Sequence, residues 1–284
     1  MVEHSDVVIV GGAAVGSSVA YFLKRDGFQG SVTVVEKDPS YQWCATGRSL
    51  ASLRQQFSTP ENIKLSQFGV AFVKGIKQEF GPEADVAFRE HGYLMMASES
   101  GRAILESNVR LQREHGADTE LLDPAGIGRR FPWLSVEGVA AAGWGRSGEG
   151  WVDPSALMNL FKAGARARGA SYVADEVTGI DQTGDRVAGV RLGSGARLGC
   201  GVLVNAAGWH SAKIAAMAGI ELPVRPRKRL IFVIDCKQPL PGCGLMIDPS
   251  GVFFRPEGKF YVTGVSPAET DDPDTEDFEI DHAM

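Results

Sequence analysis

The sequence predicts an α/β protein in which a parallel-sheet domain is interrupted by an inserted α+β domain. Residues 6–36 form a strand–turn–helix–strand pattern, and alternating helix and strand patterns return after about residue 145. The stretches 86–144 and 223–284 contain short strand patterns and no comparable glycine-rich turn. We therefore expect residues 1–85 and 145–222 to form a discontinuous Rossmann-like domain, and 86–144 with 223–284 to form the second domain.

Composition points to a soluble globular chain. Of its 284 residues, 44% are hydrophobic and 23% are charged, and no run approaches the length of a membrane span. The net charge of −6 is concentrated in residues 269–281, which hold eight acids and no base. The remainder is close to neutral, so nucleic acid is not an expected partner.

Neither a leader nor a metal site is expected. Residues 1–5 have no apolar or arginine-rich targeting pattern, and the four cysteines are scattered without C-x-x-C spacing. This pattern argues against a zinc site or a disulfide framework. It indicates a reducing compartment, and we expect the cytoplasm.

The N-terminal pattern is typical of a βαβ unit. Residues 7–10 form a continuous β-branched run, which predicts a strand buried on both faces. Residues 11–16 turn the chain into a helix, and residues 32–35 form a second buried strand that Glu36 ends. We expect the apolar face of the helix to consist of Val15, Val19, Phe22 and Leu23.

The spacing of this unit predicts a dinucleotide site. Gly11 permits the tight turn, Gly16 permits close packing of helix and strand, and the helix N-terminus faces the pyrophosphate. Glu36 follows Gly16 by 20 positions and can accept from both ribose hydroxyls. The middle glycine of G-x-G-x-x-G is replaced by Ala13. The alternative interpretation is an ordinary βα turn.

A polar loop, residues 37–52, follows the unit and leads into Arg54-Gln55-Gln56-Phe57. Arg54, beside two glutamines, could present donors to a cofactor ring; the alternative is a surface or ion-pair residue. Thr59 and Pro60 begin a helix that we expect Gly81-Pro82 to end. Its predicted core face is Leu65, Phe68, Phe72 and Ile76.

The middle of the chain predicts short strands at 86–88 and 93–97, then a helix at 98–115. Asp123-Pro124 and Asp153-Pro154 are typical helix starts. Leu157, Leu160, Phe161 and Ala165 are the expected core face of the helix that begins at residue 154.

Residues 171–218 repeat the βα pattern. Short strands are predicted at 171–173, 176–181 and 187–192, followed by a buried strand at 201–204 and a helix at 211–218. Between the last two lie Ala206, Ala207, Gly208 and Trp209. Small residues there permit close approach of a flat or anionic group, and a packing constraint explains them equally well.

The C-terminal part predicts strands at 229–235, 251–255 and 260–264. We expect Phe232, Phe253 and Phe254 to fill the core. The basic run Arg225, Arg227, Lys228 and Arg229 is interpreted as a solvated strand entrance rather than a site for an acidic substrate.

Several of these motifs together carry a family resemblance. Residues 6–36, ATGRS (45–49), Glu176-Val177 and VNAAGWHS (204–211) resemble the D-amino-acid oxidase, glycine oxidase and sarcosine oxidase (DAO) superfamily of FAD enzymes. RQQFSTPENIKLS (54–66), GYLMMAS (92–98), FPWL, EGWVDP, PRKR and SPAETDDPD resemble one branch, the FAD-dependent oxidoreductase domain proteins linked to mitochondrial complex I assembly and their bacterial relatives.

The resemblance implies that the dinucleotide is FAD and assigns roles to residues. Glu36 would hold the adenosine ribose and Val177 the adenine through its backbone, and Lys37 is a further expected cofactor-binding residue. Loop residues lying against the flavin or its phosphates would be Thr46, Gly47, Arg48, Ser49 and Arg54. The pyrophosphate turn would comprise Gly11, Gly12, Ala13, Ala14, Val15 and Gly16, and Ala206, Ala207, Gly208 and Trp209 would line the cofactor path.

The resemblance further implies oxidation of a small amine or N-methyl amino acid such as sarcosine or dimethylglycine. Arg54 is the expected catalytic residue. Amine oxidases of the superfamily carry a lysine and a histidine where this chain has Val262 and Ser266, which favours a dehydrogenase and an electron-acceptor protein as partner. The alternative function is a non-catalytic, flavin-binding assembly factor. Relatives continue for about a hundred residues beyond Met284, so we also expect a C-terminally truncated chain.

Overall fold

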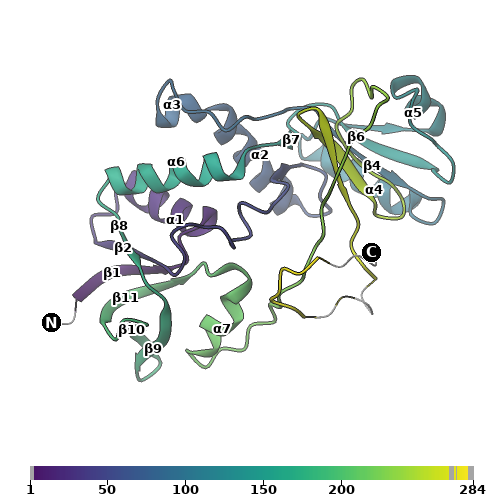
Figure 1. Cartoon of the computed structure of the whole chain (residues 1–284). Coiled ribbons are helices and arrows are strands. Elements are labelled where there is room, and N and C mark those ends of the chain that lie inside the picture. The colour runs from purple at the N-terminus through teal and green to yellow at the C-terminus, as the bar shows by residue number, and fades with distance from the viewer. Residues whose placement is uncertain (1–2, 269–271, 273, 281–284) are drawn as a thin grey trace. The chain divides into compact units, whose positions relative to one another are not determined.

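The computed structural model describes residues 3–268, 272 and 274–280 (Figure 1). Its contacts divide the chain into two compact units, each built from three segments. Unit 1 comprises Met1–Ala51, Lys77–Val86 and Asp153–Pro226; unit 2 comprises Ser52–Ile76, Ala87–Val152 and Arg227–Met284. The expected boundaries differ from these chiefly at Ser52–Ile76, which the sequence pattern assigns to the Rossmann-like domain.

The sheet of unit 1 has six strands in the order β8-β2-β1-β11-β10-β9. Its central strands are parallel, and β9 and β10 form an antiparallel edge. All six strands predicted for this unit are present. Their bounds are β1 Glu3–Val10, β2 Val32–Glu36, β8 Ser171–Ala174, β9 Val177–Thr183, β10 Arg186–Leu192 and β11 Arg197–Asn205.

Two helices of unit 1, α1 (Ala14–Arg25) and α6 (Pro154–Ala167), pack against each other (Figure 1). The predicted apolar face of α1 was wrong at Val15, which is 65% exposed. The buried residues are Gly16, Ser17, Ala20 and Tyr21. Small residues occupy the buried face because α1 approaches its neighbours closely. Tyr21 is the one large side chain among these four, and its ring centroid lies 5.6 Å from that of Phe161.

Helix α6 begins as predicted, because the Asp153 side chain accepts from the Ser155 and Ala156 N–H groups at 2.8 and 3.0 Å. Gly164 on α6 faces Tyr21, where a Cβ would lie 2.7 Å from the ring. The remaining helical segments of unit 1 are short. They are α3 (Ile76–Phe80, which begins at the last residue of a unit 2 segment), the 3₁₀ turn η1 (Gly208–His210) and α7 (Ser211–Ala216).

Unit 2 is built on a seven-stranded mixed sheet in the order β12-β15-β14-β13-β4-β6-β5. Its core includes Leu94, Ile127, Phe131, Trp144 and Met246. The strand bounds are β4 Tyr93–Ala97, β5 Thr119–Leu122, β6 Ala141–Gly145, β12 Phe232–Ile234, β13 Leu245–Ile247, β14 Phe253–Glu257 and β15 Phe260–Gly264. Unit 2 also contains the helices α2 (Pro60–Lys74), α4 (Arg102–Glu114) and α5 (Pro124–Arg130).

Several expectations for unit 2 were wrong. Strands β5, β6 and β13 were not predicted, because the first and last are short and β6 consists of alanine, glycine and one tryptophan. The strand predicted at 86–88 is absent from the described structure, where only an isolated bridge joins Arg89 to Trp151. Phe232 lies on an edge strand and is partly exposed rather than in the core.

The core face predicted for the helix after Thr59 was wrong at Leu65 and Phe68, whereas Ile76, which lies on α3, is buried as expected. Leu65 and Phe68 are 69% and 55% exposed, whereas Ile63, Val70 and Val73 are buried. The helix ends at Lys74 with Gly75 as its cap, before the predicted stop at Gly81. After Gly75 the chain resumes as α3, which ends at Phe80, directly before the predicted stop at Gly81. Segment 52–76 belongs to unit 2 because β3 (Ser52–Leu53) pairs with β7 (Gly150–Trp151) and α2 packs on α4.

Across the described ranges, none of the helices combines the length and the apolar composition that crossing a membrane requires.

A pair of helical glycines tests the close packing of α1. A Cβ at Gly16 would lie 1.8 Å from the Gly11 carbonyl oxygen, whereas one at Gly69 on α2 would meet nothing within 4 Å. Gly16→Ala should therefore destabilise the protein by about 1–3 kcal/mol. Gly69→Ala should stabilise it by about 0.5–1 kcal/mol, because alanine loses less backbone entropy in a helix. Thermal unfolding midpoints measure both, and a destabilised Gly69→Ala with an unaffected Gly16→Ala would refute this account.

Candidate functional site

The turn between β1 and α1 has the backbone of a dinucleotide cradle. Gly11 has φ +96°, and a Cβ there would lie 2.4 Å from the Ala206 carbonyl oxygen. The Gly11 carbonyl leaves no room for a side chain at Gly16. Ala13, at the position of the missing glycine, has φ −70°, which any residue adopts without strain. The departure at Ala13 therefore has no backbone cost.

Glu36 is fixed at the end of β2 beside this turn. One carboxylate oxygen accepts from the Gly12 N–H at 2.7 Å, and the other accepts from the Asp38 N–H at 2.8 Å. Each oxygen keeps a further lone pair for an outside donor. These free acceptor positions therefore fit a ribose with two adjacent hydroxyls, the ligand that the sequence pattern predicts here.

The N-terminus of α1 is met by the loop that carries Thr46. The Ala14 N–H donates to the Thr46 hydroxyl at 3.3 Å, and the N-cap residue Ala13, which precedes the helix, makes no side-chain cap bond. A helix start without its own cap, at the end of a glycine turn, is suited to a phosphate group. Arg48 folds onto its own loop, with Nε donating to the Gln42 carbonyl and the guanidinium 4.7 Å from the Trp43 ring.

The strand ends next to this turn bring the remaining predicted residues together. The Ala206 N–H donates to the Val10 carbonyl at 2.9 Å. Gly208 has φ +58°, and Lys37 lies 3.2 Å from the His210 ring and 5.9 Å from the Trp209 ring centroid. Unit 1 thus gathers Gly11–Gly16, Glu36, Lys37, Thr46 and Ala206–Trp209, and Val177 is buried at the start of β9.

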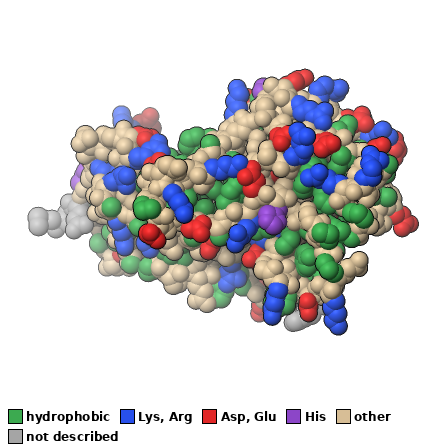
Figure 2. Space-filling model, turned by 90° about the horizontal axis from the view of Figure 1, so that it is seen from above, with side chains coloured by type: hydrophobic (Ala, Val, Ile, Leu, Met, Phe, Trp, Pro, Cys, Tyr) green, Lys and Arg blue, Asp and Glu red, His purple; other side chains and the backbone are tan. Residues whose placement is uncertain are grey.

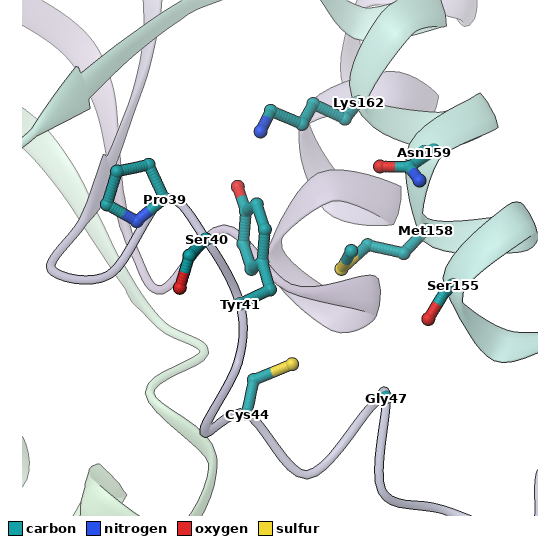
Figure 3. Close-up of a pocket in the computed structure, with 9 residues that line it drawn as sticks. All are labelled: Pro39, Ser40, Tyr41, Cys44, Gly47, Ser155, Met158, Asn159 and Lys162. Atoms are coloured by element: carbon teal, nitrogen blue, oxygen red, sulfur yellow. The ribbon is translucent and has the colours of Figure 1, made fainter.

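A polar pocket of about 270 Å³ lies between α6 and the loop after β2. Figure 3 shows Ser155, Met158, Asn159 and Lys162 extending from α6 toward the loop that carries Tyr41. The Lys162 ammonium lies 4.3 Å from the Tyr41 ring centroid. Burial lowers the pKa of Lys162 and raises that of Tyr41. The full lining is Pro39, Ser40, Tyr41, Cys44, Gly47, Ser155, Met158, Asn159 and Lys162.

Sequence reasoning missed Tyr41 and Lys162, and only Gly47 of the lining was predicted as a site residue. No spacing signal links the loop to α6, because residues 87–152, which belong to unit 2, separate them. Tyr41 has φ 57°, an unusual conformation for a residue other than glycine, but this property belongs to the structure and could not be read from the sequence.

Arg54 belongs to unit 2 and contacts other residues of that unit. Ser66 on α2 donates to the Arg54 carbonyl, and the guanidinium lies 4.7 Å from the Phe57 ring centroid. The guanidinium also lies beside the Tyr93 hydroxyl. Burial raises the pKa of Tyr93, while the Arg54 charge and hydrogen bonds to Ser52 and Arg54 oppose the shift. Arg54 is therefore partly buried next to a tyrosine.

Glu149, which the sequence reasoning did not identify, is fully buried and contacts the two residues that follow Arg54. Its carboxylate accepts from the Gln55 N–H at 2.5 Å, the Gln56 N–H at 3.1 Å and the Gln56 side-chain amide at 2.8 Å. Burial raises its pKa from 4.5 to about 7, against the opposing effect of these hydrogen bonds and of the Arg54 charge. The only signal in the sequence was an acid inside a glycine-rich link.

The basic run is paired with the acidic segment. Arg229 makes a bidentate bridge to Asp272 at 2.7 and 2.8 Å, Lys228 binds Asp277 at 2.7 Å, and Arg227 lies 3.4 Å from Asp274. These contacts are solvent-exposed and agree with a strand entrance rather than a substrate site. Figure 2 shows basic and acidic side chains interspersed over the face that it displays.

The carboxylate at Glu36 generates the first site prediction. Glu36→Ala should weaken FAD binding by about 1–3 kcal/mol, the range for a hydrogen-bonded charged group. Asp38→Ala is the control, because Asp38 offers only its backbone N–H to Glu36. Titration followed by flavin fluorescence measures both. Equal FAD affinity in wild type and Glu36→Ala would remove Glu36 from the cofactor site.

The buried carboxyl of Glu149 generates a pH prediction. In the folded chain it keeps its proton up to about pH 7, whereas in the unfolded chain it ionises near 4.5. Unfolding thus releases a proton between these values, so stability falls as pH rises through this window, by up to about 3 kcal/mol. Glu149→Gln should abolish that contribution, so the stability of the variant relative to wild type should rise from pH 4.5 to pH 7.

Glu90→Gln is the matched control for this measurement. Burial raises the pKa of Glu90, but hydrogen bonds from Lys74 and the Gly148 N–H outweigh that effect and leave the pKa lowered. Glu90 is therefore ionised in both states over most of the window, above about pH 5.5, and its variant should show no slope there relative to wild type. Urea unfolding at several pH values checks the pair, and parallel curves for wild type and Glu149→Gln would contradict the prediction.

Comparison with known proteins places the chain in a family. The family model described as DAO, FAD dependent oxidoreductase, matches residues 6–284. The chain is 39% identical over 319 residues to FAD-dependent oxidoreductase domain-containing protein 1 of Xenopus laevis, covering 99% of this chain and 64% of the relative. It thus spans less than two thirds of that relative's length.

Two further relatives carry more specific names. The chain is 31% identical to the sarcosine oxidase subunit beta of Rhizobium meliloti, covering 92% of this chain and 61% of the relative. Its structure resembles that of L-proline dehydrogenase from P. horikoshii with a TM-score of 0.79, 26% identity, and coverage of 95% and 72% of the two chains. The predicted fold class and the predicted cofactor, FAD, are confirmed. The chain belongs to the DAO family of FAD-dependent oxidoreductases.

Proposed function

We propose that this chain oxidises a small secondary or tertiary amino acid of the sarcosine or dimethylglycine type, and that it acts as a dehydrogenase rather than an oxidase. Bound FAD supplies the electron acceptor for a hydride from the carbon next to the substrate nitrogen. The observation that carries the proposal is the setting of Arg54, a partly buried guanidinium held beside Tyr93 on a braced turn.

Arg54 is suited to a carboxylate. A guanidinium presents two parallel N–H groups that match the two oxygens of a carboxylate, and partial burial strengthens such a pair. The Tyr93 hydroxyl, which burial keeps protonated, can donate a further hydrogen bond. The two side chains together would orient the acid end of an amino acid while the amine end remains available for oxidation.

The named relatives agree with this choice of substrate. Sarcosine is N-methylglycine and L-proline is a cyclic amino acid, so both substrates named are secondary amines that carry a carboxylate. The shared chemistry is a carbon next to nitrogen that loses hydride and an acid group that can be bound separately. This chemistry supports N-alkyl amino acids over amines without a carboxylate.

Two positions support a dehydrogenase. Where the resemblance implies a lysine, this chain has Val262 on β15, which is 7% exposed and pairs with Val233 and Arg255. Where it implies a histidine, the chain has the exposed Ser266. A buried valine and an exposed serine supply no cation at these positions for the reaction of oxygen with reduced flavin. An electron-acceptor protein as partner follows from the same proposal. A cytoplasmic location is proposed separately, on the ground that the cysteines are free rather than paired in disulfides.

Anaerobic mixing tests the proposed activity. The FAD-loaded protein should lose its flavin absorbance on addition of sarcosine, dimethylglycine or proline, and should regain it faster with an artificial electron acceptor than with air. Rapid recovery in air would identify an oxidase. An unchanged spectrum with every N-alkyl amino acid would contradict the enzymatic proposal and favour a flavin-binding assembly factor.

Substitution of Arg54 tests its role. Arg54→Gln should lower kcat/KM for an N-methyl amino acid by about 10- to 100-fold, mainly through KM, because a charged hydrogen-bond pair is lost. The value for an N-methyl amine without a carboxylate should change little. Arg110→Gln, an exposed arginine on α4, is the control. An equal loss for both substrates would show that Arg54 does not bind the carboxylate.

A further inference from the structure

Glu149 takes no part in the proposed chemistry, yet it is one of the largest fully buried side chains of the described structure, with 0% exposure. It lies between β6 and β7, on a link that begins at Arg146. Burying a carboxylate is costly unless its oxygens are hydrogen-bonded. The contacts of Glu149 therefore indicate what its carboxylate does.

All three direct donors to Glu149 come from two successive residues. One oxygen receives the Gln55 and Gln56 backbone N–H groups at 2.5 and 3.1 Å, and the other receives the Gln56 side-chain amide at 2.8 Å. Two successive backbone N–H groups pointing at one oxygen form an anion-binding concavity. Above its pKa of about 7, Glu149 is such an anion and is supplied by the chain itself; below it, the neutral carboxyl oxygen still accepts these bonds.

The turn that carries these donors is tight. The Phe57 N–H donates to the Gln55 carbonyl at 2.8 Å. Gln55 and Gln56 lie outside any strand or helix, so their N–H groups have no partner in a regular element. Buried backbone N–H groups need an acceptor, and Glu149 supplies one for both. Arg54 immediately precedes this turn.

Three glycines make room for the arrangement. A Cβ at Gly145 would lie 1.7 Å from the carboxylate of Glu149, and one at Gly148 would lie 2.0 Å from the Gln55 side-chain amide. A Cβ at Gly143 would lie 2.8 Å from the Gln56 side-chain oxygen. Strand β6 and the link after it therefore lack side chains where the carboxylate and amides must fit, which also explains why β6 has no strand-like composition.

The orientation of Gln56 is fixed by its neighbours. Its side-chain nitrogen donates both to Glu149 and to the Tyr93 carbonyl, each at 2.8 Å. Both partners accept, so the nitrogen rather than the oxygen of this amide must face them. Gln56 thus ties the carboxylate to the first residue of β4, whose side chain contacts Arg54.

We infer that Glu149 is a positioning residue: it anchors the Gln55–Gln56 turn and thereby holds the Arg54 guanidinium beside Tyr93. Arg54 is held from two sides, by Ser66 at its carbonyl and by Glu149 through the next two N–H groups. The benefit to substrate binding rests on the proposed function, whereas the anchoring does not.

The first experiment needs neither substrate nor turnover. In the 284-residue FAD-loaded protein labelled with ¹⁵N-glutamine and ¹⁵N-arginine, Glu149→Gln should shift the Gln55 and Gln56 amide protons upfield and speed their hydrogen exchange by about tenfold or more. The Arg54 Nε–H resonance should shift as the guanidinium leaves Tyr93. Glu90→Gln, which alters the bonds to the Gly148 N–H on the same link and to Lys74 but leaves the Glu149 carboxyl in place, should leave all three signals unchanged.

Gly145→Ala is the second variant, because it keeps the carboxylate but removes its space. It should reproduce the shifts of Glu149→Gln. Unchanged Gln55, Gln56 and Arg54 resonances in Glu149→Gln would overturn the inference, and so would equal shifts in Glu90→Gln.

The second experiment measures the consequence for the enzyme. Glu149→Gln should raise KM for an N-methyl amino acid by about tenfold and leave kcat within about twofold. In a double-mutant cycle, Glu149→Gln should add little to Arg54→Gln, because both act through one guanidinium. Additive losses would show that Glu149 acts elsewhere and overturn its link to Arg54. If the wild type oxidises no N-alkyl amino acid, the proposed function fails, and the amide and Arg54 resonances still decide the anchoring.

Discussion

The close approach of backbone to backbone at the start of α1 is the constraint on which unit 1 depends. Neither Gly11 nor Gly16 has room for a Cβ, because the Ala206 and Gly11 carbonyls occupy that space. The same approach joins the ends of β1 and β11 and puts the first turn of α1 beside Thr46. A side chain at either glycine would separate these elements, and the concave backbone surface that suits a pyrophosphate would be lost.

Backbone N–H groups orient a carboxylate in each unit, with different results. Glu36 takes one N–H on each oxygen and remains able to accept from a ligand. Glu149 takes two N–H groups on one oxygen and a side-chain amide on the other, and it is sealed from solvent. The first arrangement suits recognition of a cofactor, whereas the second suits support of a neighbouring residue. Exposure, rather than residue type, separates the two roles.

The errors at α1 and β6 share a physical origin. The face of α1 was assigned to its large apolar residues, yet Val15 is exposed while Gly16, Ser17 and Ala20 are buried. A helix that packs closely buries small residues, and hydrophobic periodicity alone does not report the distance of approach. Strand β6 was missed for a similar reason, because its glycines leave space for Glu149 and Gln56 rather than forming a side-chain surface.

The sequence by itself determined the βαβ unit, its glycines, Glu36 at the end of β2 and the helix starts at Asp123 and Asp153. Each of these depends on neighbours a few residues away, so local pattern and spacing are sufficient. Tertiary structure decided the rest. Three features join segments that lie more than 90 residues apart: the pairing of β3 with β7 that assigns residues 52–76 to unit 2, the pocket between Tyr41 and Lys162, and the burial of Glu149 against Gln55. Such contacts arise from packing, because the charge and burial of a side chain depend on which distant elements surround it.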